Sequence, residues 1–383
     1  MLNRRTLRIK AMQSLFAYEQ CKEANYHLAL ERIDQAFQPD LNSMEPQDKN
    51  LLKAQGKEAR ELFKKHYKNP DAAITTGSDT RINEVVREAI DFYYKQLDKD
   101  RRFLKQEMLK DPDRIYGRFA WLLHWLPAFV ELLQKAKPKK ELPPYDNMLN
   151  NRLIPLLKEH GELAEIYKKS GLGWDNFQDE IFVWFKEIIL KDEAFLDYLR
   201  LDEPGFEDDR QIALHLYKGV IFKHEIVNLF MEQQDLYWSE NKAILKSLIQ
   251  KTLKSIQPGE ADFELAVLSY NWEEDREFFE RIFDLTSKHG GEYEELIAAK
   301  TSNWDIERLS DTDRILLLMA IQELVNFPEI PVKVTINEYI EVSKRYSTPK
   351  SKQFINGVLD VIAVDLHKKG TIKKSGRGLI DNK

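Results

Sequence analysis

The sequence predicts an all-α protein, and three observations support this expectation. Only 15 glycines and 14 prolines occur in 383 residues, so long stretches contain no turn signal. Charged residues make up 32% of the chain with both signs interspersed, as on solvated helix faces. Apolar residues recur three or four positions apart, whereas alternating strand patterns are nearly absent. With 43% hydrophobic residues, the chain can bury a real core.

The first predicted helix begins at the N-terminus, where Leu7, Ala11, Leu15 and Tyr18 form an apolar stripe. Most basic residues of this helix are expected to lie outside the apolar stripe. Residues 69–79 read as a loop, and the proline-containing stretch 137–147 is the best candidate for a linker and a domain boundary. Further helical segments are expected near residues 23–68, 79–110, 115–135, 150–169, 174–200, 208–233, 238–256, 273–288 and 291–300.

The last ninety residues give the clearest pattern. Ser310 is expected to cap a helix that is apolar around most of its circumference and therefore central to its lobe. Pro328 and Pro331 end this helix, and another begins at Val332. Thr348 suits the N-cap of the closing helix and Pro349 its first position, so the first turn would hold residues 350–352.

Positive charge is concentrated at the two ends of the chain. Residues 1–20 carry a net +3 and residues 368–383 a net +5, which leaves −14 for residues 21–367 of a chain whose net charge is −6. This asymmetry is expected when the ends meet a polyanion and the middle does not.

Two basic clusters stand at predicted helix starts, where the helix dipole opposes them by about 0.3 to 1 kcal/mol per charge. One contains Arg4, Arg5 and Arg8, and the other contains Lys350 and Lys352. Local stability does not explain them, so each is a candidate anion site, with phosphate as the expected guest. Either cluster alone is more often a solubilising surface than a nucleic-acid site.

Polar and aromatic residues near both clusters are candidates for contact with bases. Gln13, Ser351 and Asn356 are polar readers, and Tyr18 and Phe354 are stacking candidates, although such aromatics are more often core residues. Clustered tryptophans at positions 121, 125 and 184 are likewise expected in a core rather than at an interface.

The sequence argues against several other classes of protein. Cys21 is the single cysteine, so an internal disulfide and a cysteine-based metal site are excluded, and the histidines show no paired ligand spacing. Glu338 and Glu341 have the spacing of a solvated helix face rather than of a catalytic pair. We expect no cofactor, no catalytic activity and no metal. Without a signal peptide or an uncharged membrane-spanning run, we expect a cytoplasmic protein.

Both ends of the chain resemble the NusB family of transcription antitermination factors. IPVKVTINEYIEVSKRYSTPKSKQFINGVLDVI, residues 330–362, is similar to the family's C-terminal signature, and RRTLRIKAMQSLFAYEQ, residues 4–20, to its opening helix. DTDRILLLMAIQEL and EFFERIFDLTSKHGGEYEELI look like the family's fourth and third helices. The long middle segment resembles the insertion of extended Bacteroidetes-type members.

The resemblance implies a two-lobed helical fold that binds the boxA element of nascent ribosomal RNA together with ribosomal protein NusE and acts on RNA polymerase indirectly. By this resemblance, the residues expected to contact RNA are Arg4, Arg5, Arg8, Gln13, Lys350, Ser351, Lys352 and Phe354. Position 350 is commonly acidic in short members, so the contact there is expected to differ in detail.

The resemblance also suggests a domain organisation. Residues 1–21 would form the first NusB-like helix, 22–260 a helical insertion, 261–367 the remainder of the NusB-like domain, and 368–383 a disordered basic tail. We expect a monomer or weak dimer. Two alternatives stay open: a scaffold whose insertion recruits other partners, and the NusB-like domain of an rRNA methyltransferase, which the absence of a Gly-rich cofactor loop after a strand disfavours.

Overall fold

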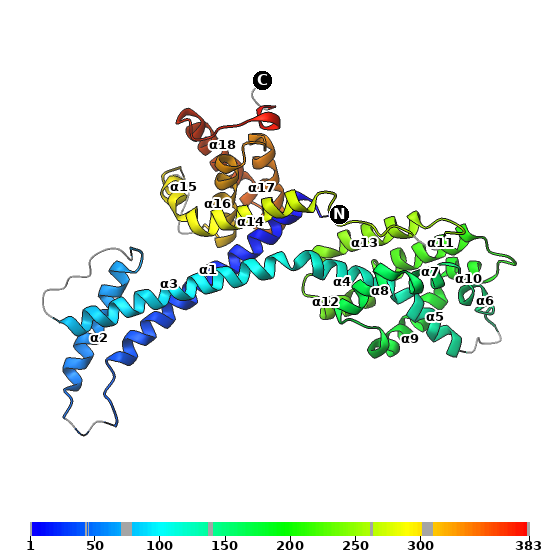
Figure 1. Ribbon diagram of the computed structural model, residues 1–383, viewed down its shortest axis with the longest axis horizontal. Helices are drawn as coiled ribbons and strands as arrows, with labels where there is room; N and C mark the ends of the chain where they lie inside the picture. The colour runs from blue at the N-terminus through cyan, green and yellow to red at the C-terminus, as the bar shows by residue number, and fades with distance from the viewer. Residues whose placement is uncertain are drawn as a thin grey trace. The chain divides into compact units, whose positions relative to one another are not determined.

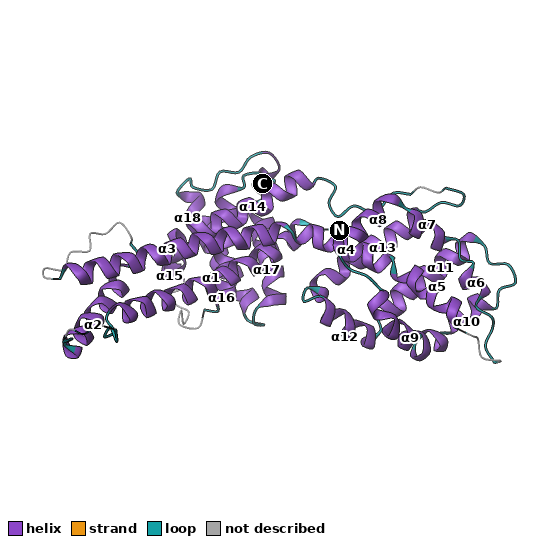
Figure 2. Cartoon of the chain, turned by 60° about the horizontal axis from the view of Figure 1, so that its bottom comes forward, coloured by secondary structure: helices purple, strands orange, loops and turns teal. Residues whose placement is uncertain are grey.

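The computed structural model describes residues 2–42, 44, 46–69, 79–136, 141–260, 263–300 and 309–380 (Figure 1). Within these ranges the chain forms helices and connecting loops without a strand, which confirms the all-α class (Figure 2). None of the described helices combines the length and apolarity needed to cross a membrane. Most of the predicted loop 69–79 and the first four residues of the predicted linker lie outside the described residues.

The chain divides into two compact units, which we call the terminal unit (residues 4–109 and 273–383) and the middle unit (residues 1–3 and 110–272). The predicted insertion, residues 22–260, thus contributes to both units. Its exact limits within the family fold stay a prediction.

The terminal unit combines a long helical hairpin with a C-terminal group of helices. Its helices are α1 Arg4–Ala36, α2 Lys49–His66, α3 Thr80–Leu109, α14 Trp272–His289, α15 Glu294–Lys300, α16 Asp311–Asn326, α17 Val332–Tyr346 and α18 Ser351–Lys368. α1 is far longer than the expected opening helix. It packs along α3 through residues such as Ile33, Val86 and Ile90, and this tertiary packing stabilises a helix of such length.

α16 is the central helix of the terminal unit, as predicted. It contacts α1, α17 and α18, and nearly all its side chains from Ile315 to Leu324 are buried. The Asp313 amide donates to the Ser310 hydroxyl over 3.1 Å, which confirms the predicted N-cap. The apolar stripe predicted on α1 is buried as well.

The middle unit contains the helices α4 Asp111–Leu123, α5 Trp125–Lys135, α6 Asp146–Leu149, α7 Leu153–Glu159, α8 Gly161–Ser170, α9 Gln178–Glu187, α10 Glu193–Leu199, α11 Phe206–Leu216, α12 Glu225–Gln234 and α13 Trp238–Ser255. Its core is aromatic, and Trp121 stacks on Trp174 with ring centroids 4.2 Å apart. The tryptophans predicted as core residues are buried.

One predicted helix, near 115–135, is broken in two at His124. Pro127 has no amide hydrogen to donate to the Leu123 carbonyl, so the helical ladder is interrupted there. The Tyr217 hydroxyl lies 2.9 Å from the carbonyl oxygens of both Leu122 and Leu123 and compensates for the lost bond. The break is therefore a stable feature of the buried core.

Candidate RNA-binding surface

A buried ion pair fastens the start of α1 to the centre of the terminal unit. Arg8 donates from Nε to Glu323 Oε2 over 2.7 Å and from Nη2 to Glu323 Oε1 over 2.6 Å. The two side chains are only 3% and 0% exposed. Because a buried charge without a partner costs several kcal/mol, this bidentate geometry holds the two helices together.

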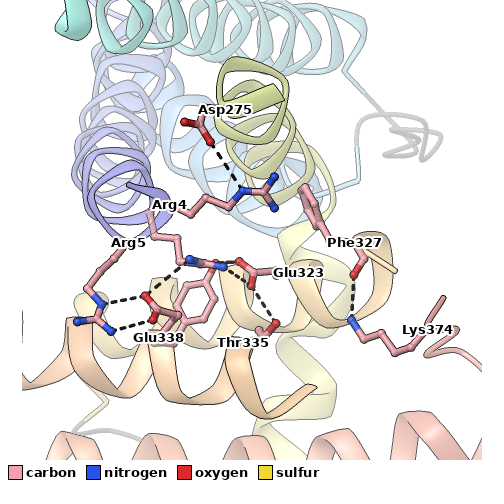
Figure 3. A network of polar contacts seen from close by, with 10 residues as sticks. Arg4, Arg5, Asp275, Glu323, Phe327, Thr335, Glu338 and Lys374 are labelled. Atoms are coloured by element: carbon pink, nitrogen blue, oxygen red, sulfur yellow. Dashed lines mark hydrogen bonds and ion pairs between the residues drawn. The ribbon is translucent and has the colours of Figure 1, made fainter. Parts of the chain in front are cut away.

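Two hydroxyls complete the surroundings of the Glu323 carboxylate. Thr335 donates to it over 2.9 Å and Tyr339 over 3.1 Å, both from α17. Burial, and then the negative charge of Glu323, raise the pKa of Tyr339, so its hydroxyl stays a proton donor. Figure 3 shows this network at the start of α1.

Arg4 and Arg5 also contact carboxylates of neighbouring helices. Arg5 makes a bidentate pair with Glu338 of α17, with Nε and Nη2 at 2.8 and 2.7 Å from the two carboxylate oxygens (Figure 3). The Arg5 side chain is nevertheless 45% exposed. Arg4 pairs with Glu274 and lies 3.8 Å from Asp275, both on α14.

These contacts correct the reasoning about the N-terminal cluster. The expectation that local stability does not explain the arginines is wrong, because carboxylates from α14, α16 and α17 neutralise all three. The expectation that the basic residues lie mostly off the buried stripe is also wrong for Arg8 and Lys10, which are buried. Among the three arginines, Arg5 is the one whose charge reaches solvent most fully.

The second cluster lies where α17 leads into α18. Ser351 is buried, and its hydroxyl donates to Asp313 Oδ2 over 2.7 Å. The hydroxyls of Ser347 and Thr348 lie 2.9 and 2.8 Å from the same Ser351 oxygen. Ser351, expected to touch RNA, therefore joins α18 to the start of α16 in this structure.

The closing helix begins two residues later than predicted. α18 starts at Ser351, and Lys350 rather than Thr348 occupies the N-cap, because the Lys350 carbonyl accepts from the Phe354 amide. Lys350 and Lys352 are exposed, and neither makes an ion pair within the described part of the chain. Phe354 and Gln13 are half-buried.

The two clusters are anchored to the same helix. Arg8 contacts Glu323 and Ser351 contacts Asp313, ten residues apart on α16. At 1.5 Å per residue, the anchors are about 15 Å apart along the helix axis. At about 3.4 Å per stacked nucleotide, this length corresponds to about four nucleotides.

Sequence reasoning passed over one exposed aromatic residue of α1. Phe16 is 39% exposed, and its helical position places it on the same face of α1 as Arg5 and Gln13. An exposed aromatic ring on this face, about 16 Å along the helix axis from Arg5, is a suitable surface for stacking an unpaired base. The spacing of residues 5, 13 and 16 could have indicated this shared face.

The arrangement defines an all-α protein whose opening helix is fastened by ion pairs to a C-terminal group of helices. The sequence model of the NusB family matches residues 242–364. A NusB transcription antitermination protein of Salinibacter ruber is 44% identical over 138 residues, which cover 34% of this chain and 86% of the relative. One of Chloroherpeton thalassium is 33% identical over 162 residues, covering 42% of this chain and 71% of the relative. The chain belongs to the NusB family.

A further relative, the NusB antitermination protein of Koribacter versatilis, is 42% identical over 94 residues, which cover 24% of this chain and 64% of the relative. No solved structure matches the chain significantly. Among the described residues, no group of three or more histidine, cysteine, aspartate or glutamate side chains is arranged to hold a metal ion.

Proposed function

We propose that this protein is a transcription antitermination factor that binds boxA of nascent ribosomal RNA together with NusE and promotes read-through by RNA polymerase. Membership of the NusB family carries the proposal, because its relatives are antitermination proteins. The proposed role is non-catalytic. The described residues contain no strand, whereas a Rossmann-type cofactor domain is built on a parallel sheet, so the methyltransferase alternative is not favoured.

In the proposed complex, exposed cations hold phosphates and aromatic rings stack on bases. Lys350 and Lys352 supply charge that no carboxylate of the described residues neutralises in an ion pair. Arg5 can exchange Glu338 for a phosphate because nearly half its side chain is exposed. Phe16 and Phe354 are the proposed stacking surfaces. Arg8 and Ser351 support this surface from inside, because both are buried.

Binding of a short boxA RNA at several salt concentrations tests the proposal. Replacing both Lys350 and Lys352 by alanine removes two phosphate contacts, so the slope of log K against log salt should fall by about 1.4. The control replaces Lys186 and Lys191 of the middle unit, which are also exposed although Lys191 pairs with Glu187, and should leave the slope unchanged. Equal slopes for parent and K350A/K352A would remove the α18 start from the interface.

The proposed partnership with NusE is tested in the same assay. Adding purified NusE should tighten boxA binding by the parent protein, and the gain should persist in the Lys186 and Lys191 control. An RNA affinity that is unchanged by NusE would contradict this part of the proposal.

A further inference from the structure

A second surface of the terminal unit is a groove that the RNA proposal does not use. It has a volume of about 1100 Å³ and lies between the hairpin of α1, α2 and α3 and the segment from the end of α14 to the start of α16. Five tyrosines line it: Tyr18, Tyr26, Tyr67, Tyr93 and Tyr94. Four of these, at positions 26, 67, 93 and 94, come from the predicted insertion.

Four of the five tyrosine rings form a connected group. The ring centroids of Tyr26 and Tyr67 are 4.9 Å apart, those of Tyr67 and Tyr93 5.7 Å, and those of Tyr93 and Tyr94 5.3 Å. The last two pairs meet edge to face, so the rings present both faces and edges to their surroundings. Such a cluster offers several π surfaces to one ligand.

Two of the tyrosines have hydroxyl groups that make no hydrogen bond within the described residues. Tyr18 is 5% exposed and Tyr93 is 7% exposed, yet within the described residues neither hydroxyl makes a hydrogen bond. Tyr94, by contrast, donates to the Tyr67 carbonyl over 2.8 Å. Neither oxygen is fully enclosed, so both hydroxyls stay accessible from the groove and can hydrogen-bond to a ligand there.

Charge decides which kind of ligand fits. Most cations at the groove are already paired: Lys22 with Glu19, Arg101 with Asp98 and Asp284, and Arg314 with Glu19 and Glu294. Three exposed carboxylates make no ion pair within the described part of the chain: Glu23, Glu295 and Asp311, the last of which interacts electrostatically with Arg314 over a longer distance. Two lysines, Lys68 and Lys288, are exposed and make no ion pair there either. Unpaired carboxylates beside aromatic rings favour a cation and disfavour a phosphate backbone.

We propose that this groove docks a basic segment of a protein partner, with an arginine or lysine side chain over the tyrosine rings and paired with the free carboxylates. Arginine suits the site best, because its planar guanidinium stacks on aromatic rings and donates to carboxylates and hydroxyls at once. The predicted insertion supplies four of the five rings, so the docking site depends on it. This proposal is independent of RNA binding at α18.

Calorimetry with the full-length protein tests the proposal. The probe is a glycine–serine peptide that carries three arginines, compared with the same peptide carrying glutamine in their place. Replacing Tyr26 and Tyr94 by leucine keeps the charge of the groove but removes two π surfaces, and should weaken binding of the arginine peptide about tenfold. F103L is the matched control, because Phe103 is 59% exposed on α3 and does not line the groove.

A second variant keeps the test informative if loss of the tyrosines unfolds the hairpin. E23Q/E295Q alters exposed side chains only, and should weaken the arginine peptide while leaving the glutamine peptide unchanged. Equal binding of the two peptides by the parent would overturn the proposal, as would unchanged affinity in both sets of variants. If the leucine variant instead loses affinity for a single-stranded RNA and the arginine peptide does not bind, the groove serves RNA and the proposal is wrong.

Discussion

Arg8 of α1 and Glu323 of α16 form a bidentate ion pair in the core of the terminal unit, although 315 positions separate them in the sequence. This pair joins the first helix of the chain to its central C-terminal helix. Together with the Arg5 and Glu338 pair, it brings the two ends of the sequence into one compact unit.

We expect E323Q to lower the free energy of unfolding of the terminal unit by about 3 to 5 kcal/mol, because it leaves the buried Arg8 guanidinium without a counter-charge. Urea unfolding monitored by circular dichroism measures the change. R8M/E323L removes both charges and should cost much less. A double variant that is as unstable as E323Q would show that the charges themselves are not the cause.

The Arg5 and Glu338 pair should behave differently, because Arg5 is half exposed. R5A is expected to lower the free energy of unfolding by no more than about 1 kcal/mol, as for other exposed ion pairs. Its affinity for boxA RNA should fall, and the salt slope should fall by about 0.7. Loss of stability without any loss of RNA affinity would assign Arg5 a purely structural role.

Glu19 gives the stability of the terminal unit a dependence on pH. Burial alone would raise the pKa of Glu19, but Lys22 and Arg314 outweigh burial, so the pKa lies below its ordinary value of 4.5. A carboxylate with a depressed pKa stabilises the fold above its unfolded pKa, and this contribution is lost as the pH falls through the folded value. E19Q should therefore be less stable at neutral pH and show a flatter decline below about pH 4.5. Parallel stability curves for the two proteins would contradict this assignment.

Sequence patterns predicted the parts of this fold that depend on neighbouring residues. The cap at Ser310, the buried stripe of α1 and the tryptophan core follow from local spacing, and the structure contains them. The partners of the opening arginines could not be predicted in this way, since periodicity reports which face is buried but not which distant carboxylate meets it. Arg8 appeared to be a surface cation for this reason.

The start of α18 shows the same limit at shorter range. Thr348 and Pro349 have the residue types of a helix start. The Ser351 hydroxyl nevertheless donates a hydrogen bond to Asp313 on α16, and α18 begins at Ser351. A tertiary hydrogen bond thus shifts a boundary that local preferences place two residues earlier. The residues proposed to contact RNA can be named from the sequence. Whether each of them is exposed or buried follows only from the fold.

Gly357 lies in the interior of α18, where glycine is less favourable than alanine by about 0.5 to 1 kcal/mol. A β-carbon there would meet nothing within 4 Å, and the backbone does not need glycine. G357A should therefore raise the free energy of unfolding by about that amount. Gly357 shares its helix face with Lys350, where RNA is proposed to bind. We therefore expect the added methyl group of G357A to weaken boxA binding by keeping the RNA away from the helix backbone. G161A in the middle unit, where the space is also open, should leave RNA affinity unchanged.

Gly378 illustrates the opposite case, because a β-carbon there would overlap the carbonyl oxygen of Pro328. The segment before it is held against the same turn: the Ser375 amide donates to Pro328 over 3.0 Å, and Lys374 Nζ donates to the Phe327 carbonyl over 3.0 Å (Figure 3). G378A should displace this segment from the turn between α16 and α17. Limited trypsin digestion should then cut near Lys374 faster than in the parent, while G291A, where the space is open, should not change the rate. Equal cleavage rates for G378A and the parent would show that the close approach at Gly378 does not hold the segment in place.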